Sequence, residues 1–168
     1  MTISYKTRVD RELLFEFYLT FSRFEYALKA AGQFRRPNPQ RNLQYTEAKP
    51  NWDGFAASLR DTFHTNRTHA LKQACENILD SPPMKQVIIN DQVAWETPVR
   101  PTSESEVEFL LRMVRCVRNN LVHGGKYNVE AHEDTQRTEI LLTSSLAILV
   151  ECLALATHVR QAFDEAII

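Results

Sequence analysis

The chain has 168 residues, which is enough for one domain with a buried core and short for two. Its 20 Lys and Arg residues are balanced by 21 Asp and Glu residues, and this excludes a polycation that binds nucleic acid through bulk charge alone. With 43% hydrophobic and 24% charged residues, the composition excludes a disordered chain. Only 4 residues are glycine, well below the usual share of about 7%, so a turn-rich β architecture is disfavoured. We expect a single, mostly helical domain over residues 1–168.

The near-neutral total hides an uneven distribution of charge. Residues 1–72 carry 12 Lys and Arg against 7 Asp and Glu, a net charge of +5, whereas residues 73–168 carry 8 against 14, a net charge of -6. The basic half can therefore meet the phosphates of a nucleic acid even though the whole chain is balanced.

The first predicted element is a helix over residues 9–31. Its apolar residues recur every three or four positions, as expected for one helix face, and Gly32 is a natural end: Leu13, Phe17, Phe21, Phe24 and Leu28. The aromatic residues of this helix are expected in the core rather than on a base-stacking platform: Phe15, Phe17, Tyr18, Phe21, Phe24 and Tyr26. Residues 34–51 contain three prolines and are predicted to form a long, exposed basic loop with Arg35, Arg36, Arg41 and Lys49.

The middle of the chain predicts two shorter helices, over residues 52–64 and 68–80, with Pro82 and Pro83 ending the second. Residues 87–95 are the β-like stretch, in which Asn90 and Asp91 can turn a small hairpin.

Two long helices are predicted in the last third. Ser103 and Glu106 form a capping box at the start of the first, whose apolar stripe ends before the stop at Gly124 and Gly125: Val107, Leu110, Val114, Val117 and Leu121. The last helix, of about thirty residues, begins near Glu133 or Asp134 and contains no Gly or Pro. The predicted fold is all-α: an up-and-down bundle of four to five helices, with the long basic loop and at most one short hairpin.

Cysteine and histidine spacing gives no sign of a disulfide framework or a metal site. The three cysteines, Cys75, Cys116 and Cys152, are far apart and form no CxxC pair. Four histidines outside the segment discussed below lack ligand spacing and are expected as ordinary surface or core residues: His64, His69, His132 and His158. We expect no metal and no cofactor.

The most apolar stretch, residues 140–159, is interrupted by polar residues: Thr143, Ser144, Ser145, Glu151 and His158. This pattern favours a buried core helix over a membrane span. The first ten residues are polar and mixed, unlike an apolar leader. The expected location is the reducing cytoplasm, without a membrane partner.

The segment RCVRNNLVHGGKY, residues 115–127, departs from a plain core helix. On an ideal helix Arg115, Asn119 and His123 lie along one polar strip, since they are four residues apart. Arg118 lies roughly 140° from His123 around the helix axis. The two side chains can therefore converge only if the last turn unwinds at the glycines, or if a second copy of the helix packs alongside.

This segment resembles the hallmark of the HEPN superfamily: an Arg, a polar residue, three to five further residues and a His. Here it reads Arg118, Asn119, Asn120, Leu121, Val122, His123. The position at the end of a long helix in a helical chain is similar too. RFEYALKAAG, residues 23–32, resembles the ApeA-like and plasmid-borne HEPN branches.

The resemblance implies a homodimer whose two motifs face each other and act as a metal-independent endoribonuclease in a bacterial defence or toxin–antitoxin system. Attack by the RNA 2′-hydroxyl leaves a 2′,3′-cyclic phosphate and needs a base, an acid and a cation. Imidazole can do both proton transfers at neutral pH, so His123 is acid or base. Arg118 stabilises the phosphorane, and Asn119 orients His123 or the phosphate. A second protomer supplies the second His and Arg.

RNA contacts are expected from residues near the motif and in the basic loop: Arg115, Lys126, Arg35, Arg36 and Arg41. One departure concerns regulation. In the toxin branch silenced by a nucleotidyltransferase, a Tyr follows the His after one residue, whereas Gly125 stands there in this chain and the nearest tyrosine is Tyr127. An antitoxin protein is a candidate partner, and the departure at Gly125 argues against regulation by modification of that tyrosine.

Each sharp interpretation has a plainer alternative. Arg118 and His123 can simply be cations that complement the dipole at a helix end. Asn119 and Asn120 argue against a purely structural role for this segment, because Asn is a poor helix former. Glu25 is either the partner of an arginine on the motif helix or a residue at its rim. At the level of function, the alternatives are a non-catalytic HEPN module for dimerisation, nucleotide binding or partner-protein binding, and a purely structural bundle.

Overall fold

The computed structural model describes residues 9–39, 46–65, 67–122 and 135–166. Within these ranges it contains six helices: α1 (Arg11–Ala30), α2 (Trp52–Ser58), α3 (His69–Asp80), α4 (Glu106–Val122), α5 (Thr135–Leu155) and α6 (Thr157–Glu165). Four strands form two antiparallel hairpins: β1 (Arg35–Pro39) with β2 (Thr46–Pro50), and β3 (Lys85–Ile89) with β4 (Gln92–Glu96). The protein is thus mostly helical, as the all-α expectation has it, but the described residues form six helices in place of four to five and two hairpins in place of at most one.

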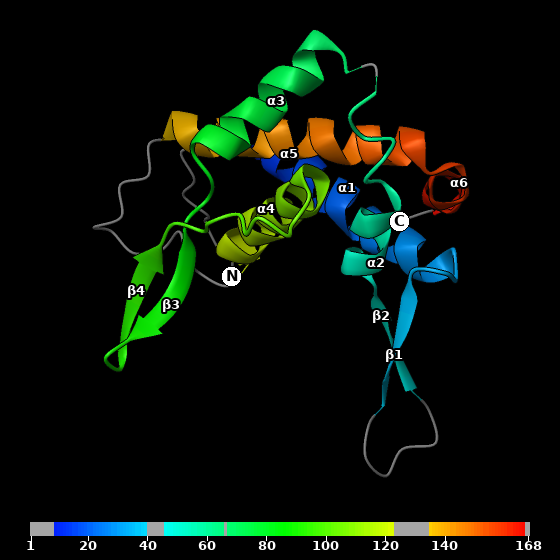
Figure 1. Cartoon of the computed structure of the whole chain (residues 1–168), viewed down its shortest axis with the longest axis horizontal. Coiled ribbons are helices and arrows are strands. Elements are labelled where there is room, and N and C mark those ends of the chain that lie inside the picture. Colours follow the sequence, from blue (N-terminus) through cyan, green and yellow to red (C-terminus); the bar gives the residue numbers. More distant parts are fainter. Residues whose placement is uncertain (1–8, 40–45, 66, 123–134, 167–168) are drawn as a thin grey trace, which may run out of the picture.

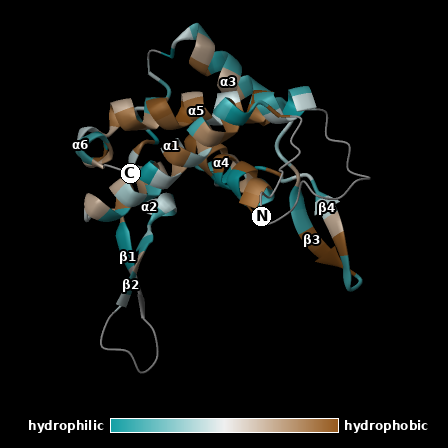
Figure 2. Ribbon diagram, turned by 180° about the vertical axis from the view of Figure 1, so that it is seen from behind, coloured by the Kyte–Doolittle hydropathy of each residue, from teal (hydrophilic) through white to brown (hydrophobic). Residues whose placement is uncertain are grey.

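The core lies where α5 packs against α1, α3, α4 and α6 (Figure 1). α1 begins at a true cap, because the Asp10 carboxylate accepts a 2.8 Å hydrogen bond from the Leu13 N–H. It ends as predicted before Gly32, whose φ of +81° suits glycine. The predicted apolar stripe of α1 is buried at Phe17, Phe21, Phe24 and Leu28, and in Figure 2 the hydrophobic colouring gathers where the helices meet.

Three aromatic side chains of α1 do not join this core, contrary to the expectation for the aromatic group. Phe15, Tyr18 and Tyr26 are 64%, 55% and 53% exposed, respectively. They follow one another at helical spacing on the side of α1 that no other described element covers. The aromatic group of α1 is therefore split between the core and the surface.

The predicted thirty-residue last helix is two helices. The chain leaves helical geometry at Ala156, which has φ -124° and ψ 77°, and α6 then turns to pack against α1. Arg23 of α1 donates to the Phe163 carbonyl at 2.7 Å, and its guanidinium lies 4.3 Å from the Phe163 ring centroid. Tertiary packing makes this break, so the absence of Gly and Pro did not prevent it.

By length and composition α5 is apolar enough to cross a membrane, and 56% of its most apolar window is buried inside the protein. Contacts with four other helices account for that burial. The surroundings of α5 match the predicted core helix.

The predicted basic loop is a hairpin at its base. β1 and β2 pair antiparallel, with Arg35 opposite Pro50 and Arg36 opposite Lys49. A two-stranded ribbon has only edge strands, where proline is tolerated, so the prolines did not exclude strands here. Buried Phe34 anchors the hairpin edge-on against Phe55, at a ring distance of 5.1 Å. Arg41 lies outside the described residues.

The second hairpin confirms the prediction for residues 87–95 and begins slightly earlier. Asn90 and Asp91 have φ values of 51° and 59°, as a two-residue type I′ turn requires. Ile88 and Val93 stand opposite each other near its tip and are largely exposed. Both hairpins project from the same side of the helical body, at opposite ends of it (Figure 1).

One helix start and one helix end differ from the prediction. α4 begins at Glu106, and its capping box is Ser105 with Glu108 rather than Ser103 with Glu106: the Ser105 N–H donates to Glu108 at 2.8 Å, and the Glu108 N–H donates to the Ser105 hydroxyl at 3.4 Å. α2 is shorter than predicted and ends at Ser58, with turns following it.

Candidate active site

Helix α4 presents two separate polar sides beside its buried apolar stripe. One side faces α1 and carries Arg118. The other side carries Arg112, Arg115 and Asn119, which follow one another at spacings of three and four residues. The described part of α4 ends at Val122, directly before His123 in the sequence.

Arg118 is held against α1 by two contacts. Its Nη2 lies 3.2 Å from Glu25 Oε1, and its guanidinium carbon lies 4.9 Å from the Phe21 ring centroid. The Arg118 side chain is still 27% exposed, so its charge remains accessible from one side. This resolves the open question about Glu25: it is both the partner of Arg118 and a residue at the rim.

Glu25 is itself supported by a buried tryptophan. Trp52 Nε1 donates to the same Glu25 oxygen at 3.2 Å, and Trp52 is only 5% exposed. Its ring stacks on Phe24 at 5.2 Å and 3° and on Phe21 at 5.3 Å and 28°. The Arg118 guanidinium is therefore held by Glu25, which in turn is held by Trp52, and the Trp52 ring is stacked in the core. Sequence reasoning missed Trp52, whose signal was a large aromatic residue directly after the proline-rich segment.

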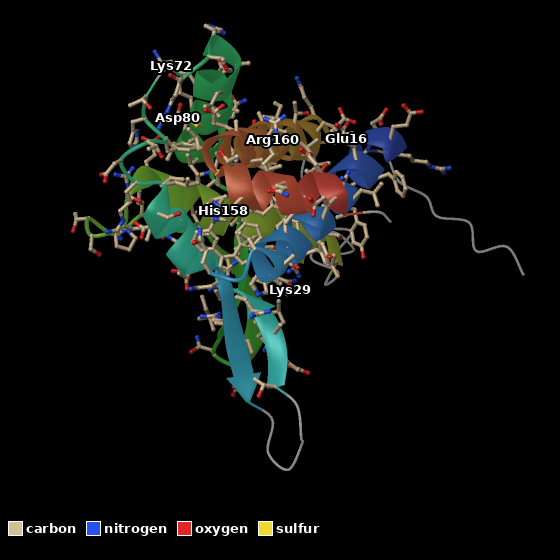
Figure 3. All side chains as sticks on the ribbon, turned by 90° about the vertical axis from the view of Figure 1, so that its right-hand side faces the viewer. Glu16, Lys29, Lys72, Asp80, His158 and Arg160 are labelled. Atoms are coloured by element: carbon tan, nitrogen blue, oxygen red, sulfur yellow. The ribbon has the colours of Figure 1, made fainter. Side chains whose placement is uncertain are left out.

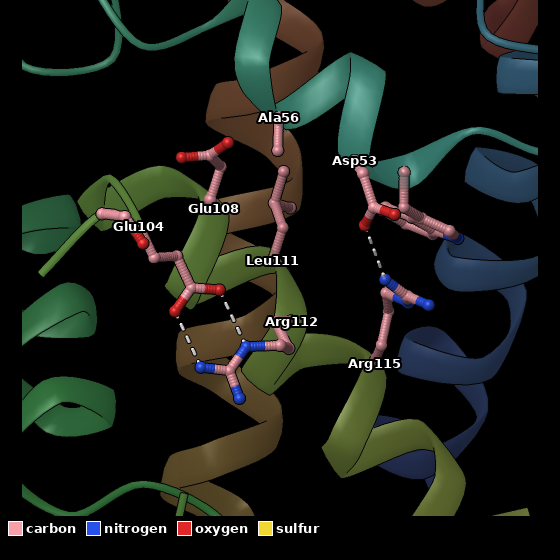
Figure 4. Close-up of a pocket in the computed structure, with 9 residues that line it drawn as sticks. Asp53, Ala56, Glu104, Glu108, Leu111, Arg112 and Arg115 are labelled. Atoms are coloured by element: carbon pink, nitrogen blue, oxygen red, sulfur yellow. Dashed lines mark hydrogen bonds and ion pairs between the residues drawn. The ribbon is translucent and has the colours of Figure 1, made fainter. Parts of the chain in front are cut away.

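The other polar side of α4 carries two arginines that are each paired with a carboxylate (Figure 4). Arg115 lies 3.4 Å from Asp53, a carboxylate whose side chain is 77% exposed. Arg112 makes two hydrogen bonds to Glu104, at 2.8 and 2.7 Å. Together these residues line a cavity of about 270 Å³ between α2 and α4.

A third carboxylate of this cavity is engaged by Arg60. Glu108 accepts hydrogen bonds of 2.6 and 3.1 Å from the Arg60 guanidinium, and that pairing, together with the Ser105 cap, lowers the pKa of Glu108 to about 2. Glu104 and Glu108 are both already paired with arginines, so neither is a free general base in this cavity.

The two consecutive asparagines have different environments. Asn119 is exposed, as an orienting residue at the surface requires. Asn120 is 8% exposed, and its Nδ2 donates to the Met84 carbonyl at 2.8 Å. A structural role therefore accounts for Asn120, because its buried side chain needs a hydrogen-bond partner and finds it in the Met84 carbonyl.

Several predicted site residues lie outside the described residues: His123, Lys126 and Arg41, as well as Tyr127. The convergence of Arg118 with His123 stays a prediction. Arg35 and Arg36 are exposed on β1, which packs against α1, and they are not part of the Arg118 cluster.

The cysteines are buried thiols. Burial raises the pKa of Cys75 to about 11 and raises the pKa of Cys152 further, and the Cys116 thiol lies 3.4 Å from the Met84 carbonyl. Thiols held in the protonated form are poor nucleophiles and metal ligands. Across the part of the chain that the structure describes, no group of three or more His, Cys, Asp or Glu side chains is placed to hold a metal ion.

Comparisons with known proteins do not assign the chain to a family: no family model, no curated protein and no solved structure matches it.

Proposed function

We propose that the protein is a metal-independent endoribonuclease of the HEPN type, which cleaves RNA by attack of the 2′-hydroxyl and leaves a 2′,3′-cyclic phosphate. The observation that carries the proposal is the anchored Arg118: a guanidinium fixed by Glu25 and Phe21, partly open to solvent, at the end of the helix that leads to His123. A cation fixed before the substrate arrives stabilises developing phosphorane charge without reorganisation.

In this mechanism Arg118 clamps the phosphate, and His123 transfers the proton of the 2′-hydroxyl or of the departing 5′-oxygen. Asn119, exposed beside Arg118 in sequence, orients the phosphate or the imidazole. Glu25 and Trp52 are positioning residues, because they act through Arg118. Two protomers of a homodimer supply the second His and Arg, and the cellular context is bacterial defence or a toxin–antitoxin pair in the cytoplasm.

The β1–β2 hairpin supports RNA as the substrate. Arg36 and Lys49 stand directly opposite each other, and Arg35 adjoins them, all three exposed. Like charges across a strand pair repel each other, and a bound polyanion removes that cost.

The test is cleavage of mixed RNA in EDTA by the wild type and by two variants, Arg118→Ala and His123→Ala. Cleavage by the wild type and its loss in both variants are expected. The matched control is Arg160→Ala, since Arg160 lies on α6 in an exposed pair with Asp164 at 3.6 Å. Undiminished cleavage in the His123 variant, or a requirement for Mg²⁺, refutes the proposal.

A second candidate, a non-catalytic module that binds a partner protein, is favoured by a different observation. Phe15, Tyr18 and Tyr26 form an exposed aromatic row on α1, and aromatic residues are enriched at protein interfaces. This candidate predicts no RNA cleavage by the wild type in the same experiment. It also predicts that replacing the three aromatic residues abolishes dimerisation or partner binding in sedimentation, with the Arg118 variant unaffected.

A further inference from the structure

The second polar side of α4 forms a cleft with the base of the β3–β4 hairpin. This cleft has a volume of about 320 Å³, and its polar lining comes from Lys85, Gln86, Arg112, Arg115, Asn119 and Asn120. No carboxylate is found among the described lining residues. The cleft therefore gathers three cations and three amides, which is a lining suited to an anion.

The three cations differ in how far their charge is already neutralised. Arg112 is held by both oxygens of Glu104, so its charge is largely neutralised and it mainly shapes the cleft. Arg115 has the long contact to exposed Asp53. Among the described residues Lys85 forms no ion pair, although Glu96 is opposite it in the hairpin register. Lys85 and Arg115 are thus the cations that a ligand can recruit.

The cleft is built into the fold. Met84, which precedes Lys85, is tied to α4 through its carbonyl, which accepts 2.8 Å and 3.4 Å contacts from the Asn120 amide and the Cys116 thiol. These bonds fix the start of β3 against the helix. The distance between Lys85 and the Arg115–Asn119 side of α4 is consequently set before any ligand binds, which lowers the entropic cost of binding.

We infer that this cleft binds a backbone phosphate of the RNA strand other than the one cleaved at Arg118; the identification of RNA rests on the proposed function. Lys85 and Arg115 supply the charge, and the amide of Gln86 donates hydrogen bonds to phosphate oxygens. None of the described lining residues has an aromatic ring on which a base would stack, so the site reads the backbone and not the sequence. The hairpin thereby acts as a clamp that holds the strand along α4.

The test is binding of a fluorescent, fully 2′-O-methylated oligoribonucleotide of about 12 nucleotides. It lacks the attacking hydroxyl, so the wild-type protein can be used. The variant is Lys85→Gln, and the matched control is Lys72→Gln on α3, an exposed lysine at the end of the molecule opposite the hairpins (Figure 3). Affinity is measured by anisotropy over a range of salt concentrations, and thermal melting checks that each variant is folded.

Loss of one phosphate contact lowers the slope of log affinity against log salt by about 0.7 for a single strand, which corresponds to about eightfold weaker binding at about 50 mM salt and about threefold at about 200 mM. We expect this for Lys85→Gln and no change for Lys72→Gln. Equal slopes for the wild type and Lys85→Gln overturn the inference. So does AMP that competes as well as the oligonucleotide, since the cleft is then a nucleotide pocket.

The result is separable from the proposed function. If unmodified RNA is not cleaved but Lys85→Gln flattens the salt slope, the phosphate site stands and the nuclease proposal fails. If RNA is cleaved and Lys85→Gln binds as the wild type does, the nuclease proposal stands and the phosphate site fails.

Discussion

The two polar sides of α4 carry arginines only three residues apart, yet they are built differently. Arg118 packs on a buried aromatic ring and pairs with Glu25, which Trp52 supports from behind. Arg115 makes a longer contact to a carboxylate that is mostly in solvent, and its guanidinium lies farther from an aromatic ring, 6.0 Å from the Trp52 centroid. The Arg118 guanidinium is thus held by closer contacts than the Arg115 guanidinium.

This difference separates two tasks that a nuclease needs. Stabilising a transition state requires a charge that does not reorganise, whereas capturing a flexible strand tolerates a mobile side chain. The Arg118 side suits the first task and the Arg115 side suits the second. Removing the arginine of the Arg118 side should therefore affect the rate of cleavage, whereas removing Arg115 should affect the binding of RNA.

The largest expected effect comes from removing Trp52, the buried side chain that supports Glu25 and Arg118. Trp52→Ala should lower the free energy of unfolding by about 3–5 kcal/mol, because the ring is buried and stacked on Phe21 and Phe24. Urea denaturation measures it. The control Trp95→Ala, at a half-buried position on β4, should cost less than about 1.5 kcal/mol. Equal losses would show that Trp52 has no special part in the scaffold.

The next effect compares the two arginines directly. Arg118→Ala should slow RNA cleavage by about 100-fold or more, since it removes a fixed cation from the transition state. Arg115→Ala should mainly weaken binding, which raises KM with kcat retained. Single-turnover and steady-state cleavage assays separate these parameters. Equal losses of kcat in both variants would contradict the division of tasks.

The adjacent asparagines give a smaller, matched contrast in stability. Asn120→Ala should cost about 1–3 kcal/mol, because it leaves the Met84 carbonyl without its amide donor. Asn119→Ala should change stability by less than about 0.5 kcal/mol, since its side chain is exposed. Thermal unfolding of both variants checks this, and a reversed order would refute the assigned environments.

The smallest effect is the pH dependence of the Glu108 cap. Because folding lowers its pKa from 4.5 to about 2, the stabilisation is present above pH 4.5 and is lost as the pH falls towards 2. Glu108→Gln should be less stable than the wild type by about 1 kcal/mol at neutral pH, since exposed Arg60 limits the gain. The two curves should meet near pH 2. A difference in stability between the two proteins that grows as the pH falls would contradict this prediction.

Sequence patterns predicted well those elements that local residues dictate. α1 follows from its apolar spacing, its cap and Gly32, and the β3–β4 turn follows from Asn90 and Asp91. The break at Ala156 and the β1–β2 pairing were missed, because both depend on packing against α1 and not on local residues. In the site, Glu25 was weighed as a partner for an arginine, whereas Trp52 became visible only once α2 was placed beside α1.

The most direct test of the central claim is the chemistry of the RNA ends left by the purified protein in EDTA. The account predicts 2′,3′-cyclic phosphate and 5′-hydroxyl ends in the wild type and none above background in His123→Ala. Ends bearing a 5′-phosphate and a 3′-hydroxyl, or cyclic ends that persist in the His123 variant, would contradict it.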